Sequence, residues 1–209
     1  MSDKLVDTYV FKSDTLPRHV GIEGLGYSGK TVLIERLAAM HPQLATIPEY
    51  YELNGCKSFV SQGQLRNRSV QRRVLARLVC LERQRQRMIG ASIAERLLTV
   101  SDRTFFSCIA HDFARGKVER GINWQATQQI FSRKSFRAPD MILFLTTPDH
   151  ISSQYADRIG IRQDSMTRNP IFLNQYRAYF DTHVSPMIDT RFVTASEAHS
   201  IVRALLNKT

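Results

Sequence analysis

Cysteine is scarce in this chain of 209 residues, and it occurs only at Cys56, Cys80 and Cys108. No two of them are close enough to form a zinc-binding pair, and such a widely spaced set indicates reduced thiols rather than a disulfide framework. Hydrophobic runs are also short, since none approaches the roughly 20 residues of a membrane-spanning helix. The first residues lack the basic segment and apolar core of a signal peptide. These absences predict a cytoplasmic protein with no membrane partner.

Acidic residues are fewer than basic ones. The chain has 19 aspartates and glutamates and 29 lysines and arginines, which gives a net charge of +10. Such a balance favours anionic partners such as nucleotides, nucleic acids or membrane surfaces. Much of the positive charge lies between residues 66 and 87, where apolar residues recur at helical spacing. This pattern predicts an amphipathic helix over about residues 65–89, ended by Gly90. No known nucleic-acid-binding motif accompanies it, so we do not expect a nucleic acid as partner.

A complete phosphate-binding motif, Gly, four residues, then Gly-Lys-Thr, lies between residues 24 and 31. A segment readable as a strand precedes it and a segment with helical apolar spacing follows, which is the context that the motif requires. Backbone N–H groups of the loop and the positive end of the helix would bind an anion. We expect Lys30 to reach the β and γ phosphates of a nucleoside triphosphate and the Thr31 hydroxyl to hold Mg²⁺. The expected cofactor-binding residues of the loop are Gly24, Gly26, Tyr27, Ser28, Gly29, Lys30 and Thr31.

Short apolar segments alternate with helical segments along the rest of the chain. Strands are expected at about residues 19–24, 44–47, 97–102, 141–146 and 191–194. Five such strands separated by helices predict an α/β fold with a mainly parallel sheet that is covered on both faces. We expect residues 1–17 to be an N-terminal extension and residues 18–209 to form a single domain.

An acidic residue followed by an arginine ends the third expected strand, at Asp102 and Arg103. The carboxyl ends of parallel strands meet at the edge where open α/β folds bind their ligands. An aspartate there can organise Mg²⁺, and an arginine can neutralise a phosphoryl group. We therefore expect Asp102 to serve the metal and Arg103 to serve a phosphate.

Several segments, taken in order, resemble the thymidylate kinase family of nucleoside monophosphate kinases. They are residues 22–25 with 29–31, 81–83, 102–110, 138–145, 158–179 and 194–196. The resemblance implies a three-layer P-loop nucleotide kinase fold, in which helices flank a five-stranded parallel sheet and a lid at about residues 152–168 carries arginines. It also implies ATP and Mg²⁺ as cofactors, a nucleotide or nucleoside as acceptor, and a homodimer.

The resemblance further implies roles for single residues. Arg83 would contact the acceptor base and Arg103 the acceptor phosphate, while Arg158 and Arg162 would close over the transferring phosphoryl group. Ser196 would lie beside the adenine of ATP. The implied acceptor-binding residues are Glu49, Tyr50, Arg83, Arg103 and Ser107, and the implied catalytic residues are Lys30, Glu49, Arg103, Arg158 and Arg162.

The acceptor side departs from the family's pattern. The loop has Gly26 where an acidic residue is usual, no arginine flanks Glu49, and Cys108 replaces a polar residue that reads the base. Three functions therefore stay open. The first, which we expect, is transfer of the γ-phosphoryl group of ATP to a nucleoside monophosphate. The second is transfer to a hydroxyl group of a nucleoside or another small molecule, with Glu49 as base. The third is non-catalytic nucleotide binding or action on nucleic-acid ends.

Overall fold

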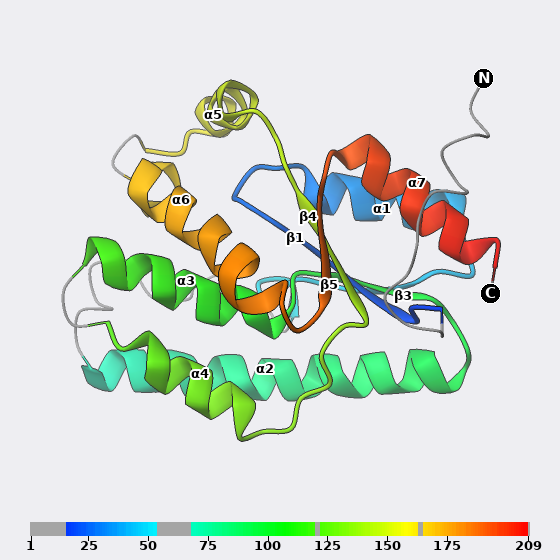
Figure 1. The fold of residues 1–209 in the computed structure, drawn as a ribbon, viewed down its shortest axis with the longest axis horizontal. Coiled ribbons are helices and arrows are strands. Elements are labelled where there is room, and N and C mark those ends of the chain that lie inside the picture. The colour runs from blue at the N-terminus through cyan, green and yellow to red at the C-terminus, as the bar shows by residue number, and fades with distance from the viewer. Residues whose placement is uncertain (1–15, 54–67, 120–121, 163–164, 209) are drawn as a thin grey trace.

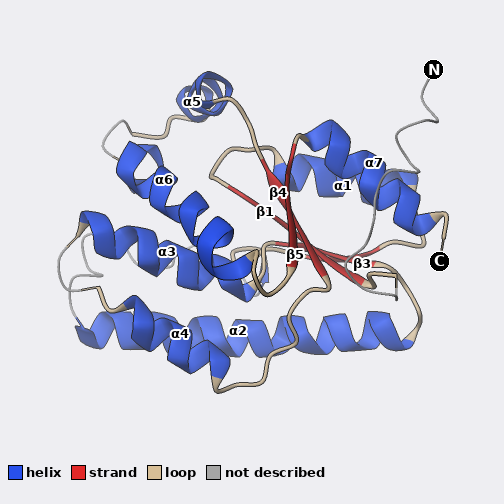
Figure 2. Cartoon of the chain, viewed as in Figure 1, coloured by secondary structure: helices blue, strands red, loops and turns tan. Residues whose placement is uncertain are grey.

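Five parallel strands form the centre of the protein in the computed structural model, which describes residues 16–53, 68–119, 122–162 and 165–208. Their order across the sheet is β2-β3-β1-β4-β5. Figure 2 shows strands in red at the centre, between the helices. The strands are β1 (His19–Gly24), β2 (Ala45–Ile47), β3 (Thr99–Asp102), β4 (Met141–Leu145) and β5 (Asp189–Val193). Because every neighbouring pair is parallel, the segments that follow the strands gather at one edge of the sheet.

Helices cover both faces of this sheet (Figure 1). One face carries α1 (Lys30–Met40) and α7 (Ala195–Leu206), and the other carries α2 (Arg68–Ala94), α3 (Phe105–Val118) and α6 (Pro170–Tyr179). On this second side α4 (Trp124–Ser132) packs against α3, and a π-helical turn, η5 (Phe180–Val184), continues α6. The short helix α5 (Asp149–Arg158) and the 3₁₀ turn η4 (Met166–Arg168) lie between β4 and α6. The expected α/β fold, a five-stranded parallel sheet between helices, is confirmed.

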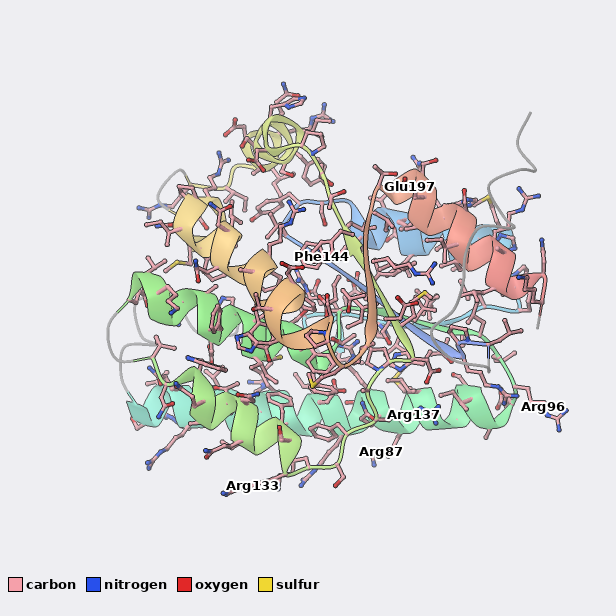
Figure 3. All side chains as sticks on the ribbon, in the orientation of Figure 1. Arg87, Arg96, Arg133, Arg137, Phe144 and Glu197 are labelled. Atoms are coloured by element: carbon pink, nitrogen blue, oxygen red, sulfur yellow. The ribbon has the colours of Figure 1, made fainter. Side chains whose placement is uncertain are left out.

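The core consists of two apolar clusters, one on each face of the sheet. In β4 the side chains alternate between them, since Met141, Leu143 and Leu145 join the cluster with α1 and α7, whereas Ile142 and Phe144 join the cluster with α3 and α6. This alternation explains why the strand reads as an unbroken apolar run. Figure 3 labels Phe144 among the side chains that fill the space between the sheet and α6.

Helix α2 is longer than the sequence predicts, because it continues through Gly90 to Ala94. The expectation that Gly90 ends the helix is wrong. A single glycine costs a helix only about 1 kcal/mol relative to alanine, and burial of the neighbouring Ile89, which is 2% exposed, helps to hold the helix together. The outer side of α2 is basic, and Figure 3 shows Arg87 and Arg137 on that side of the molecule.

Some predictions concern residues outside the described ranges. The expected extension falls mostly on residues 1–15, and Cys56 and residues 163–164 of the expected lid also lie outside the described ranges. The division into an extension and one domain therefore stays a prediction. Within the described residues, no helix is both long enough and apolar enough to cross a membrane.

Candidate active site

The phosphate-binding loop connects β1 to α1, and two of its glycines have backbone conformations that other residues rarely adopt. Gly24 has φ +145° and Gly29 has φ +83°. A Cβ atom at Gly24 would lie 2.9 Å from the carbonyl oxygen of Leu145 and 2.9 Å from the Ser28 hydroxyl. These glycines let the chain turn directly into α1, so that the N–H groups of the turn and of the helix start face one anion site.

Lys30, the first residue of α1, is buried within this loop. Its Nζ donates hydrogen bonds to the carbonyl oxygens of Leu25 at 2.7 Å and Gly24 at 3.3 Å, and to the Ser28 hydroxyl at 3.2 Å. Burial, assisted by the charge of Arg103, lowers the pKa of Lys30 to about 7. A bound triphosphate would restore its charge by providing a strong anionic partner.

Thr31 and Asp102 meet beside the loop, as a magnesium site requires. The Thr31 hydroxyl donates to Oδ2 of Asp102 at 2.7 Å. The other oxygen, Oδ1, is buried and has no hydrogen-bond partner among the described residues, and burial raises the pKa of Asp102. The described residues contain no group of three or more acidic, histidine or cysteine side chains that could hold a metal. Thr31 and Asp102 therefore fit Mg²⁺ that is held jointly with substrate phosphates and waters, as is usual for this ion.

Arg103 joins the carboxyl ends of three strands. It directly follows β3 with φ +63°, a left-handed conformation that is uncommon outside glycine. Its Nε lies 2.5 Å from Oε1 of Glu49, which comes after β2. Its Nη1 donates to the Tyr176 hydroxyl at 3.0 Å and to the carbonyl oxygen of Gly24, at the end of β1, at 3.3 Å. Glu49 and Arg103 thus form a charged pair next to the phosphate-binding loop.

Glu23 is linked to this pair through Ser107 and Tyr176, and the sequence interpretation placed it in the loop motif without giving it a role in the site. It is fully buried and accepts hydrogen bonds from the hydroxyls of Thr104 at 2.7 Å and Ser107 at 2.5 Å. Burial raises the pKa of Glu23. The Tyr176 hydroxyl, which accepts from Arg103, donates to the Ser107 hydroxyl at 3.0 Å. Ser107, expected to bind substrate, is therefore already bonded to protein groups.

Arg83 lies outside the pocket, contrary to the expectation that it contacts the acceptor base. It belongs to the exposed side of α2, whereas Glu82 and Arg85 are 2% and 1% exposed. Glu82 accepts a hydrogen bond from the Tyr50 hydroxyl at 2.6 Å, so Tyr50 also has a protein partner. The buried acid and arginine of this helix are therefore three residues apart, on one face, rather than adjacent. That spacing is the signal that could have identified Arg85.

A pocket of about 670 Å³ contains the charged groups and continues between α2, α3 and α6. Its charged end has Lys30, Glu49 and Arg103, and its far wall is mainly apolar, with Leu75 and Leu78 from α2 and Phe172 and Leu173 from α6. The size is typical of a small-molecule site. Expected site residues that line the pocket are Gly26, Tyr27, Ser28, Gly29, Lys30, Thr31, Glu49, Tyr50, Arg103 and Ser107; those that do not are Gly24, Arg83, Asp102, Arg158, Arg162 and Ser196.

The expected lid segment meets the pocket through other residues than its predicted arginines. Arg158 and Arg162 are exposed. Thr167 lines the pocket, and its hydroxyl lies 3.5 Å from that of Tyr27. The next residue, Arg168, is only 10% exposed, and its Nη1 lies 2.7 Å from Oδ1 of Asp157. Its Nε and Nη2 are buried without a hydrogen-bond partner among the described residues. Sequence reasoning missed Arg168, since nothing in the local pattern marks it as buried.

Solved structures share this fold. A deoxyadenosine kinase from M. mycoides with bound dCTP is 12% identical, with a TM-score of 0.62 over 91% of this chain and 100% of that chain. The same kinase with the products dCMP and a flexible dCDP bound gives a TM-score of 0.59 at the same identity and coverage. No curated protein sequence matches this chain.

The sequence itself matches one family over most of its length. The sequence model of the thymidylate kinase family matches residues 22–205, which include the loop, the Asp102-Arg103 pair and all but the last residue of α7. This chain therefore belongs to the thymidylate kinase family and is a phosphotransferase of the nucleotide kinase type.

Proposed function

We propose that the protein transfers the γ-phosphoryl group of ATP to a hydroxyl group of a nucleoside or a nucleoside-like small molecule, with Glu49 as base. The observation that carries this proposal is the 2.5 Å pair between Glu49 and Arg103 within the pocket. A hydroxyl nucleophile must lose a proton as the new bond forms, whereas a phosphate oxygen is already ionised. A carboxylate beside the acceptor can therefore take up the proton of a hydroxyl acceptor, whereas an ionised phosphate acceptor has no proton to give it.

The charge balance of the pocket also favours a hydroxyl acceptor. The lysines and arginines among its described lining residues are Lys30, Arg103 and Arg115. Lys30 belongs to the donor loop, Arg103 is balanced by Glu49, and Nη2 of Arg115 lies 2.6 Å from a carboxylate oxygen of Glu119. An acceptor phosphate with nearly two negative charges would approach Glu49 without an uncompensated arginine among these residues. Repulsion between like charges would then oppose its binding.

The reaction would proceed by in-line transfer without a covalent intermediate. Glu49 would accept the proton of the acceptor hydroxyl as that oxygen bonds to the γ-phosphorus, while the bond between this phosphorus and the β–γ bridging oxygen breaks and releases ADP. Arg103 would orient Glu49 and neutralise the transferring group. Lys30 and the N–H groups of the loop would hold the β and γ phosphates. Thr31 and Asp102 would hold Mg²⁺, which supplies positive charge to the phosphate oxygens.

Closure of the segment around residues 152–168 is also part of the proposal. Arg158, Arg162 and Arg168 could bring positive charge toward the phosphoryl group and exclude water. Arg168 has two buried N–H-bearing nitrogens without partners among the described residues and directly follows Thr167, which lines the pocket. We therefore add it to the two arginines predicted from the sequence.

A nucleoside monophosphate is the competing acceptor, and membership of the thymidylate kinase family is the observation that favours it. In that case Arg103 would bind the acceptor phosphate directly and would have to leave Glu49. The two candidates differ in what they require of the Glu49 carboxylate, so a change at this residue separates them.

The test is the effect of Glu49→Gln on turnover with a nucleoside acceptor at saturating Mg·ATP. We expect kcat to fall by about 10²–10⁴-fold, the usual contribution of a general base, while the Kd for Mg·ATP stays unchanged. Glu35→Gln, which neutralises an exposed carboxylate on α1, is the matched control. A fall in kcat of less than about tenfold, in a variant that is folded, would contradict a role as general base.

A further inference from the structure

Arg85 is a buried arginine of α2 that holds the backbone on which Arg103 is placed. It is 1% exposed. Its Nη2 donates hydrogen bonds to the carbonyl oxygen of Asp102 at 3.1 Å and to that of Arg103 at 2.5 Å. A charged donor that binds two successive carbonyl groups fixes the direction of both peptide planes, because charge-assisted hydrogen bonds are short and strong.

The backbone that Arg85 binds would not adopt its conformation readily by itself. Arg103 has φ +63°, in the left-handed region that non-glycine residues seldom occupy. Such conformations persist only where the surrounding structure holds them, and they occur often at active sites. From this conformation the Arg103 side chain reaches Glu49 and Tyr176.

Arg85 also contacts the segment that carries Glu49. The ring of Tyr50, the residue after Glu49, lies 4.4 Å from the guanidinium carbon of Arg85. The Tyr50 hydroxyl donates to Oε2 of Glu82, and Nε of Arg85 lies 3.9 Å from that oxygen. One buried cation therefore contacts both chain segments that supply the charged pair of the site, one after β2 and one after β3.

We propose that Arg85 is a positioning residue for phosphoryl transfer, which sets the Asp102–Arg103 turn so that the Arg103 guanidinium meets the Glu49 carboxylate. The proposal rests on the proposed function in taking the Glu49–Arg103 pair as the catalytic centre. Arg85 itself does not line the pocket, so it acts on the reaction through Arg103. Both carbonyls accept from one nitrogen, Nη2, and the guanidinium carbon lies over the Tyr50 ring. A lysine keeps the charge but has no planar group to lie over that ring.

The first test is a double-mutant cycle of kcat with Arg85→Lys and Arg103→Lys. We expect Arg85→Lys to lower kcat by about 10–100-fold, the loss typical of a reacting group displaced by about 1 Å, with the Kd for Mg·ATP unchanged. Arg103→Lys should then cost much less in the Arg85→Lys background than in the parent protein. Arg87→Lys, at an exposed position on the same helix, is the matched control and should leave kcat unchanged. Independent, multiplicative effects of the two substitutions would overturn the proposal.

The second test needs no acceptor, and so separates this proposal from the proposed function. The Arg103 amide donates to the carbonyl oxygen of Ile22 and the Thr104 amide to Oε1 of Glu23. Both amides should exchange with solvent at least about tenfold faster in Arg85→Lys, as expected for a locally loosened turn, while amides of β4 stay protected. Unchanged exchange would overturn the positioning role even if Glu49→Gln abolishes turnover. If Arg85→Lys does not fold, the double variant Arg85→Gln/Glu82→Gln removes both buried charges together. The same two amides should then exchange faster in this double variant than in Glu82→Gln alone.

Discussion

The two ends of the active-site pocket are built in different ways. At the donor end, Lys30 is held by the carbonyl oxygens of Gly24 and Leu25, six and five residues earlier in the chain. At the acceptor end, Arg103 contacts Glu49 and Tyr176, which lie 54 and 73 residues away. The donor end therefore depends on one local loop, whereas the acceptor end depends on side chains brought together by the whole fold.

This difference shows where the site can change during evolution without loss of the fold. The donor loop depends on glycine conformations and backbone N–H groups, which few substitutions preserve. The acceptor end depends on individual side chains such as Glu49, Tyr50 and Ser107, each of which can be exchanged if its partners change with it. A kinase can thus keep its use of a nucleoside triphosphate while it acquires a different acceptor.

Lys30→Ala is expected to have the largest effect on the donor end. Loss of the one lysine of the loop removes charge stabilisation of the transferring phosphoryl group, and we expect kcat to fall by about 10²–10³-fold. The measurement is ADP release with saturating acceptor, and Arg36→Ala, an exposed cation on the same helix, is the control. Equal losses in both variants would show that the effect is not specific to the loop.

Asp102→Asn tests whether the donor end includes the metal. The amide keeps a hydrogen-bond acceptor for Thr31 but removes the charge that would hold Mg²⁺. We expect the Mg²⁺ concentration needed for half-maximal activity to rise by about 10–100-fold, as when an outer partner of a metal is lost. The exposed Asp181→Asn should leave it unchanged. If Asp102→Asn lowers kcat at every Mg²⁺ concentration without changing the half-saturation point, Asp102 does not serve the metal.

The pH dependence of Mg·ATP binding tests the burial of Lys30. Its pKa is about 7 because burial disfavours the charged form. The triphosphate prefers protonated Lys30. Below pH 7 most of the free protein already carries this proton, whereas above pH 7 Lys30 is mostly neutral and must take up a proton when the triphosphate binds. We expect Kd to rise between pH 7.5 and 9, by at most about tenfold per pH unit. Isothermal titration calorimetry in two buffers would detect the proton uptake, and a pH-independent Kd would contradict a lowered pKa.

Arg83→Ala should have the smallest effect, and it tests whether Arg83 belongs to the acceptor end of the pocket. Arg83 is exposed and does not line the pocket. We expect the KM for the acceptor to change by no more than about twofold, as for other surface substitutions. A steady-state titration of the acceptor measures this, and a tenfold rise in KM would restore the base-contacting role that the family resemblance implies.

The fold and the donor end could be predicted from the sequence because they follow from short-range patterns. The apolar strands, such as the run from Met141 to Leu145, and the loop from Gly24 to Thr31 are each readable within eight residues. The prediction for Gly90 was wrong because the packing of α2, visible only in three dimensions, outweighs the helix preference of one residue.

The acceptor end could be predicted only in part. Glu49 and Arg103 were expected to serve the acceptor, but their mutual contact is a long-range result of folding. The family resemblance of residues 81–83 implied that Arg83 contacts the acceptor base. In the structure Arg83 lies on the exposed side of α2, whereas Arg85 lies on its buried side. The roles of Arg158, Arg162 and Ser196, the homodimer and the cytoplasmic location stay predictions.

The acceptor preference is the measurement that tests the central claim most directly. Initial rates of ADP release should be compared for a panel of nucleosides and their 5′-monophosphates at equal concentration, with saturating Mg·ATP and with Lys30→Ala as the blank. We predict turnover with at least one nucleoside that exceeds turnover with its own monophosphate, because Glu49 accepts the proton of a hydroxyl group. Turnover confined to monophosphates would contradict the assignment and would place the protein with the phosphate-accepting kinases of its family.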